Sequence, residues 1–101
     1  MPNVIPRVRR ITASYTLELW DDILDCGSDT GAITVTVPAA ALEKGKEYLI
    51  KDSDGNAGTN NITIDPAGSV LIDEASTYVM NINLQATKIV PNAARTAWNV
   101  I

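Results

Sequence analysis

Residues 32–37, Ala-Ile-Thr-Val-Thr-Val, alternate apolar and hydroxyl side chains and are followed by Pro38. Successive side chains of a β-strand point to opposite faces, so this pattern predicts a strand whose Ile33, Val35 and Val37 face a core. Proline has no backbone N–H and cannot continue a ladder of hydrogen bonds. We therefore expect one half-buried strand that ends at Val37.

Similar stretches lie further along the chain. Residues 61–65 and 78–84 alternate in the same way, the second with Met80, Ile82 and Leu84 on one face. Three shorter stretches are rich in strand-forming residues: 47–51, 88–90 and 97–101. Isoleucine, valine and threonine make up 29 of the 101 residues, a bias toward strands. We predict an all-β fold, either a small β-sandwich or a jelly-roll-like domain.

One stretch has helical character. Residues 39–44 follow Pro38 and are stopped by Gly45, an arrangement that favours the start and the end of a helix. The stretch is too short for more than one or two turns. We therefore expect a single short helical turn among the strands.

The most specific turn signal is Asp-Ser-Asp-Gly-Asn at residues 52–56, which tolerates the positive φ angles of a tight reversal. Strand 47–51 is therefore expected to pair back with strand 61–65. The connector between them is small and polar, so we expect an exposed loop. The residues of this exposed loop that we single out are Asp52, Asp54, Gly55, Asn56 and Asn60.

Prolines follow three of the predicted strands at similar intervals, at Pro38, Pro66 and Pro91. Such a period, of about 25 residues, would suit the coils of a β-solenoid. The sequences between the prolines differ too much to be called repeats. A solenoid therefore stays an alternative to the sandwich.

The length of 101 residues suits one core, so we expect a single β domain at residues 11–101 preceded by an extended N-terminal arm at 1–10. Arg7, Arg9 and Arg10 give the arm a charge of +3. The formal net charge of the chain is −4, so residues 11–101 carry −7. Such an arm suits an acidic partner surface, and a frayed terminus is the alternative. The acidic body repels phosphodiester backbones, so we expect no nucleic-acid partner.

The residue types that the chain lacks exclude several classes of function. The chain has no histidine and one cysteine, Cys26, which excludes Ser-His-Asp and Cys-His catalysis and an intrachain disulfide. No apolar run is long enough for a signal peptide or a spanning helix. We expect a soluble protein made in a cytoplasm, with no membrane partner.

Two patterns invite an interpretation as sites. The segment 52–63 has oxygen ligands at alternate positions, but Ala57 and Thr63 replace the glycine and the glutamate of a calcium loop. Acidic residues cluster at two predicted turns, where they commonly serve local hydrogen bonding and solubility: Asp21, Asp22 and Asp25 in the first, and Asp73 and Glu74 in the second. We expect no catalytic residues, no metal and no other cofactor.

The two tryptophans, Trp20 and Trp98, could stack on sugars. In a chain without phenylalanine, a place in the core or at a subunit interface is the better expectation. The hydroxyl face formed by Thr34 and Thr36 suits either packing against a neighbouring subunit or plain solvation.

One longer segment resembles a known module. A strand ending in Thr-Val-Pro-Ala-Ala (36–40) precedes Lys-Gly-Lys-Glu-Tyr-Leu-Ile-Lys-Asp (44–52), a Gly-Asn-Ala-Gly-Thr-Asn loop (55–60) and Asn-Ile-Thr-Ile (61–64). This order resembles a module of tailed-bacteriophage virion proteins, chiefly tail-fibre and head-fibre or decoration proteins. The similarity covers about residues 11–101. It implies a trimer and brings no catalytic residues.

The resemblance implies a non-enzymatic virion structural protein. We expect a homotrimeric capsid decoration, or cement, protein that stabilises the head by bridging capsid subunits, with the major capsid protein or other virion proteins as partners. Arg7, Arg9 and Arg10 are expected to contact the capsid. The alternative is a tail-fibre or receptor-binding module that recognises host surface glycans.

Overall fold

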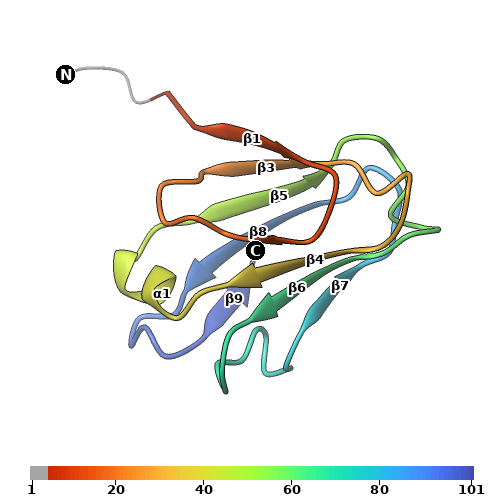
Figure 1. The fold of residues 1–101 in the computed structure, drawn as a ribbon. Coiled ribbons are helices and arrows are strands. Elements are labelled where there is room, and N and C mark those ends of the chain that lie inside the picture. The colour runs from red at the N-terminus through yellow and green to blue at the C-terminus, as the bar shows by residue number, and fades with distance from the viewer. Residues whose placement is uncertain (1–4) are drawn as a thin grey trace.

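Nine strands and one short helix make up residues 5–101, the part of the chain that the computed structural model describes (Figure 1). Two sheets pack face to face, with the strand orders β1-β3-β5-β8-β9 and β2-β4-β6-β7. The predicted all-β fold is therefore confirmed as a two-sheet sandwich. The elements are β1 Val8–Ile11, β2 Tyr15–Thr16, β3 Ile23–Cys26, β4 Ile33–Val37, α1 Ala40–Lys44, β5 Tyr48–Asp52, β6 Ile62–Pro66, β7 Tyr78–Met80, β8 Ala86–Pro91 and β9 Trp98–Val100.

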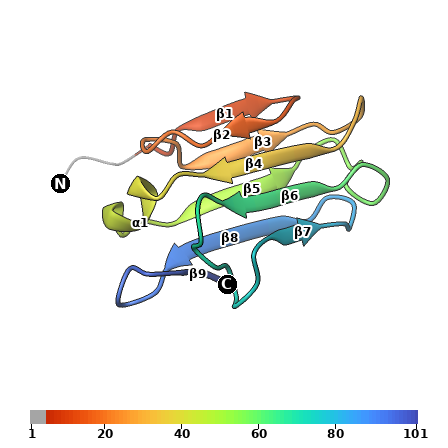
Figure 2. The ribbon, with the colours of Figure 1, turned by 60° about the horizontal axis from the view of Figure 1, so that its bottom comes forward.

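The first six strands alternate between the two sheets, so that the chain winds down the molecule (Figure 2). Strands β1, β3 and β5 pair in parallel, and so do β2, β4 and β6. This is the path of a solenoid with coils of unequal length, because the coil from Val8 to its partner Ile23 is shorter than the coil from Ile23 to its partner Leu49. The parallel pairing also separates this sandwich from a jelly roll, which is built from antiparallel strands.

The proline spacing reflects these coils in part. Val37 pairs with Pro66 across the parallel strands β4 and β6, so Pro38 and Pro66 end successive coils. Pro91 instead ends β8 and pairs with Trp98 in an antiparallel hairpin. The solenoid alternative therefore describes residues 8–66, whereas β7, β8 and β9 return antiparallel to their neighbours.

The predicted pairing of strand 47–51 with strand 61–65 is wrong. Strand β5 lies between β3 and β8, while β6 lies between β4 and β7 in the other sheet. Their connector crosses from one sheet to the other instead of folding back. Both strands bury alternate side chains between the sheets, so this arrangement lets their apolar faces oppose one another across the core.

The predicted N-terminal arm is wrong for residues 8–10, which form β1 with Ile11 and pair in parallel with β3. The segment joins the sheet because Ile11 is buried in the core. Backbone hydrogen bonds from Ile23 to the Arg7 carbonyl and from Gly27 to the Ile11 carbonyl hold its two ends. The domain therefore begins before residue 11. The first four residues of the predicted arm lie outside the described part of the chain.

The core fills the space between the sheets. The residues predicted to face it in β4 and β6 are fully buried, as is Met80 at the end of β7. Trp98 and Tyr48 are its largest side chains, and their rings meet edge to face with centroids 5.9 Å apart. This confirms the core expectation for Trp98.

Ile82 and Leu84 were predicted to continue the core face of a strand over 78–84, and this prediction is wrong. Strand β7 ends at Met80, and the two side chains are 65% and 56% exposed. The cause is local, because the Gln85 side-chain carbonyl accepts the backbone N–H groups of Asn81 and Ile82 and closes a turn.

The predicted helical turn is confirmed as α1. Gly45 ends it in the left-handed conformation, with φ 67°, and donates its N–H to the carbonyl of Leu42. Arg95 covers this end and donates from Nη1 to the carbonyl of Glu43 at 2.8 Å. Between residues 5 and 101 there is no helix with the length and apolar character needed to span a bilayer.

Replacing Gly45 with alanine should lower the free energy of unfolding by about 1–2 kcal/mol, because an L-residue is strained at positive φ. A Cβ atom there would also lie 2.8 Å from the Arg95 guanidinium. Urea unfolding measures the effect. Gly31→Ala is the matched control, since Gly31 has open space around it and should change little. Equal effects of the two substitutions would contradict this account of Gly45.

Candidate functional site

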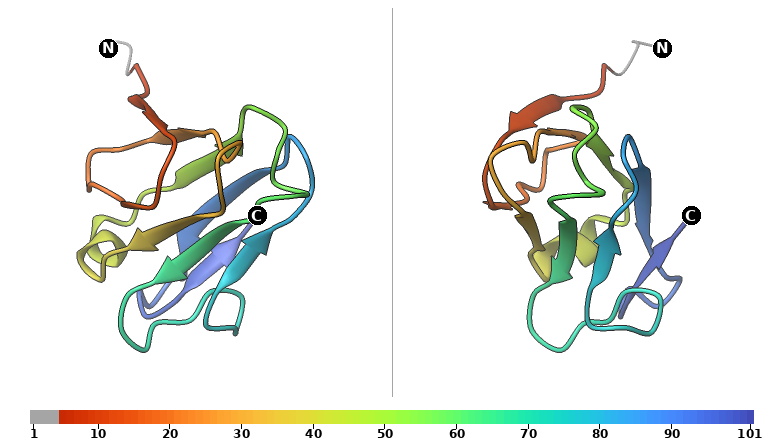
Figure 3. Two further views of the ribbon diagram at one scale, coloured as in Figure 1. Left: turned by 45° about the vertical axis from the view of Figure 1, so that its right-hand side comes forward. Right: turned by 90° about the vertical axis from the view of Figure 1, so that its right-hand side faces the viewer.

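Four connections gather at the end of the sandwich opposite α1, on the right of Figure 1. We call three of them, residues 27–32, 53–61 and 81–85, the loop end. The right panel of Figure 3 looks onto it. Parallel winding explains most of the gathering, because every chain segment that leaves β1, β3 or β5 does so at the same end of the sheet. Residues 81–85 join them because β7 runs antiparallel to β6.

Asp52 organises the loop end from inside the protein. Its Oδ1 accepts the backbone N–H groups of Gly55 and Asn56 at 3.1 and 3.4 Å, and its Oδ2 accepts those of Ala57 and Leu84 at 3.0 and 2.9 Å. Burial alone would raise the pKa of Asp52, but these four donors lower it below its ordinary value. The prediction of an exposed Asp52 is therefore wrong, since a fully buried carboxylate ends β5.

Asn60, one of the predicted loop residues, and its neighbour Gly58 tie the three connections to one another. Asn60 is half-buried and donates from Nδ2 to the carbonyl of Ser28 at 2.7 Å. The N–H of Gly58 donates to Oδ1 of Asn83 at 2.8 Å. Gly55 and Asn56 are half-buried and Asp54 is exposed. Sequence reasoning therefore located an ordered, cross-braced surface, although it did not identify the residues that brace it.

The tip of the loop end is apolar and strained. Leu84 has a φ of 67°, which is rare for a residue with a branched side chain, and it still exposes more than half of that side chain. Ile82 is more exposed still. The N–H of Leu84 is held by Asp52 and that of Ile82 by Gln85, so the backbone presenting both side chains is anchored.

The predicted contact arginines are largely paired within the subunit. Arg9 donates from Nε to Asp21 at 3.1 Å and lies over the Tyr15 ring, 5.4 Å from its centroid. Arg10 contacts Asp54 at 2.6 Å and Asp25 at 3.4 Å, and it passes over Gly27, where a Cβ atom would collide with it. These pairs hold β1 to the body.

Asp21 makes the local hydrogen bonds expected of an acidic turn residue, but it is buried instead of solvated. It is fully buried and accepts the Tyr15 hydroxyl at 2.6 Å and the Glu18 N–H at 2.9 Å, in addition to Arg9. Burial, followed by the hydrogen bond to Asp21, raises the pKa of Tyr15 to about 12. The carboxylate of Asp21 is therefore committed to structural hydrogen bonds.

The remaining candidate residues, Trp20 and Asp73, lie in different parts of the fold. Trp20 is 53% exposed in the turn before β3, at the end opposite the loop end, so it does not lie in the core, and the alternative place at a subunit interface stays a prediction. Asp73 accepts the N–H of Val100 at 2.9 Å and therefore braces β9. Across residues 5–101, no three Cys, Asp or Glu side chains converge where they could hold a metal ion.

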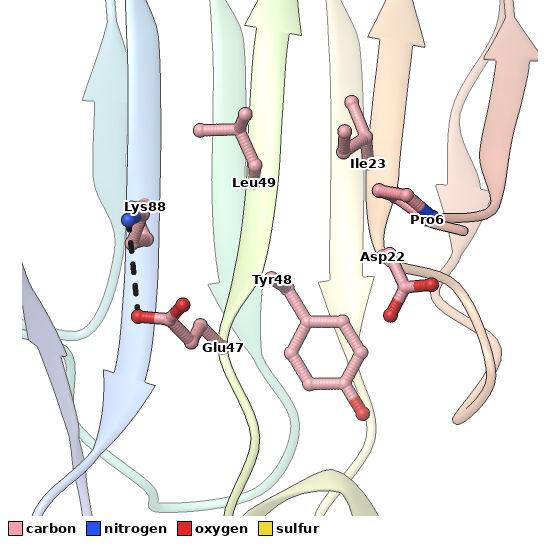
Figure 4. Close-up of a pocket in the computed structure, with 7 residues that line it drawn as sticks. All are labelled: Pro6, Asp22, Ile23, Glu47, Tyr48, Leu49 and Lys88. Carbon is pink, nitrogen blue, oxygen red and sulfur yellow. Dashed lines mark ion pairs between the residues drawn. The ribbon is translucent and has the colours of Figure 1, made fainter. Parts of the chain in front are cut away.

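A surface that sequence reasoning missed is an open groove of about 290 Å³ on the outer side of the five-stranded sheet (Figure 4). Its lining residues are Pro6, Asp22, Ile23, Glu47, Tyr48, Leu49 and Lys88. Ion pairs flank it, with Glu47 3.8 Å from Lys88 and Asp22 2.6 Å from Lys46. The sequence held one signal for this groove. Ile23 and Leu49 are apolar although they point outward, in strands whose inward-pointing residues already include apolar ones.

Asp52→Asn should destabilise the protein by about 2 kcal/mol, because one amide oxygen cannot accept four N–H groups and its NH₂ group adds donors. Chemical denaturation followed by circular dichroism measures this. Asp65→Asn, at a half-buried position on the outer side of β6, is the matched control. A loss no larger than that of the control would refute the central role of Asp52.

The protein should lose stability in acid. Asp52 and Asp22 both have lowered pKa values in the folded state, Asp22 through the Arg7 N–H and Lys46. Their contribution is therefore complete above the unfolded value near 3.9 and disappears as the pH falls through the folded values. The urea midpoint of the wild type should be lower at a pH below that range than at a pH above it, and this drop should be smaller for Asp52→Asn. Equal falls would show that Asp52 is not involved.

Comparison with known proteins adds no family to this description. No protein-family model matches the chain, and no curated protein matches it significantly.

Proposed function

We propose that this protein is a non-enzymatic structural subunit of a tailed-phage virion. Specifically, it is a homotrimeric decoration, or cement, protein that attaches to the outside of the head and bridges neighbouring major capsid subunits. Two findings support the proposal. One is the resemblance of residues 11–101 to virion modules, and the other is the rigid apolar tip of the loop end.

The tip carries the proposal. Ile82 and Leu84 hold two large apolar side chains in water on a backbone that Asp52 and Gln85 keep in place. A pre-ordered segment loses little conformational entropy when it binds. Positive φ in a leucine is unfavourable, so its presence at a surface tip is a reason to look for a partner.

The contact with the shell is therefore assigned to the loop end and not to Arg9 or Arg10. Arg9 and Arg10 already have carboxylate partners inside the subunit, and breaking those pairs would undo part of the binding energy. Arg7 contributes its backbone, which accepts the N–H of Ile23 at 2.9 Å. The basic segment then serves to dock β1.

A repeated lattice suits this kind of contact. One tip buries only two apolar side chains, which is a weak interaction. Three copies in one trimer, each touching a neighbouring capsid subunit, would combine weak contacts into tight attachment. The short ties between coils keep the tip in a constant position relative to the sheets.

A receptor-binding tail module is the second candidate, and the exposure of Trp20 favours it. An exposed indole is a good platform for a sugar ring. Copy number on purified virions separates the candidates, because decoration requires hundreds of copies on the head and a tail module only small multiples of three. Loss of cell binding on Trp20→Ala, with attachment to heads absent, would favour the tail module.

Leu84→Gly tests the main proposal sharply. Glycine removes the apolar side chain and also relieves the positive-φ strain, so folding stability should stay equal or rise. Each tip should bind heads stripped of the protein about 10- to 100-fold less tightly, the value of one buried leucine, and a trimer that loses three such side chains should lose at least that much. Co-sedimentation with heads measures binding, and urea unfolding measures stability.

Val79→Ala is the matched control, because Val79 is an exposed apolar residue on the outer side of β7. It should bind heads like the wild type. Unchanged binding of Leu84→Gly would remove the tip from the contact. Failure of the wild type to associate with heads at all would contradict the decoration proposal.

A further inference from the structure

The outer side of the five-stranded sheet carries an apolar row that crosses its strands. Val8, Ile23 and Leu49 are paired neighbours in β1, β3 and β5. The next position across the sheet is Lys88 in β8, and beyond it lies Ile101, whose N–H donates to the Lys88 carbonyl. Val8 is 61% exposed and Ile101 68% exposed, and Ile23 and Leu49 line the open groove (Figure 4). We call these four apolar residues and the charged side chains beside them the outer face.

We propose that the outer face is the surface through which copies of this chain contact one another. The inference rests on the proposed function, which requires a trimer, and it identifies the part of the subunit that builds it. Contiguous exposed apolar side chains on an ordered surface commonly mark protein contacts. The charges around the row indicate which partner fits.

The outer face is electrically balanced. Its cations are Arg10, Lys46, Lys51 and Lys88, and its own anions are Asp22, Asp25 and Glu47. Asp54 of the adjoining loop end pairs with Arg10 and supplies the fourth negative charge. Three of the cations have a carboxylate within 4 Å in the same subunit, and Lys51 donates to the carbonyl of Leu84. A partner therefore need not supply any counter-charge, which argues against nucleic acid or a strongly charged protein.

The balance favours a second copy in particular. Since the whole chain carries −4 and the outer face carries none of it, the excess negative charge lies elsewhere on the subunit. Two identical subunits repel through that excess charge, and they approach most easily through a balanced surface. Charges already paired within each subunit also lose less solvation when they are covered.

The outer side of the four-stranded sheet differs. Its outward residues are mostly hydroxyl-bearing, such as Thr34, Thr36 and Thr63, with Asp65 beside them. Threonine hydroxyls and a carboxylate are well solvated, so this side has less to gain from being covered. It provides a matched control surface on the same molecule.

Leu49→Glu and Thr63→Glu each add one negative charge to an outward, half-buried strand position, on opposite sides of the sandwich. Sedimentation equilibrium should show a trimer for the wild type and for Thr63→Glu. Leu49→Glu should dissociate at least about tenfold more readily. Circular dichroism checks that each variant is folded, and Ile101→Glu, at an exposed position after β9, tests the same face should Leu49→Glu not fold.

Dissociation by Thr63→Glu with Leu49→Glu still trimeric would overturn the inference, and so would a monomeric wild type. Binding of the same variants to heads separates this failure from failure of the proposed function. A wild type that decorates heads but self-associates elsewhere refutes only the outer face. A wild type that forms trimers through the outer face but ignores heads refutes only the decoration.

Discussion

A single buried carboxylate holds together the part of this fold where the chain changes sheets. Asp52 ends β5, and its two oxygens accept four backbone N–H groups from two connections that are distant in sequence. A buried charge without partners would be strongly unfavourable, whereas one surrounded by donors stabilises every segment that provides them. The crossing from β5 to β6 and the turn before β8 are therefore positioned together, and the apolar tip at Ile82 and Leu84 takes its place from the same atoms.

The winding of the first six strands requires the chain to cross between the sheets at every step. Parallel strands need a connection that leaves the sheet and returns, and the second sheet supplies it here. The arginines of β1 have a related role at the first coil, because Arg9 reaches Asp21 near β3 and Arg10 reaches Asp54 beyond β5. Charged side chains on an edge strand also discourage pairing with strands of other molecules. The basic N-terminal segment thus belongs to the architecture of the sheet.

The two surfaces that support the proposals point in different directions. The loop end terminates the strands, and the outer face lies along the side of the sheet. A subunit that uses an end for one partner and a side for copies of itself can meet both at once, as the proposed decoration protein must. Trp20 lies at the end opposite the loop end, so a glycan there would not compete with the contact made by the tip.

The sequence by itself determined the strands from β4 onward, apart from the end of β7, together with the short helix and part of the core, because alternation at Ile33, Val35 and Val37 and the punctuation by Pro38 and Gly45 act over a few residues. It did not locate β1, β2 or β3. It also indicated the importance of residues 52–60. Only the tertiary structure decided that Asp52 is buried, that Arg9 and Arg10 are paired, and that β5 and β6 belong to different sheets. These features rest on contacts between residues 12 to 44 positions apart, and an Asp-Gly turn signal is compatible with either a hairpin or a crossing. Local patterns specify which residues form strands, but partner choice depends on which faces can be buried together.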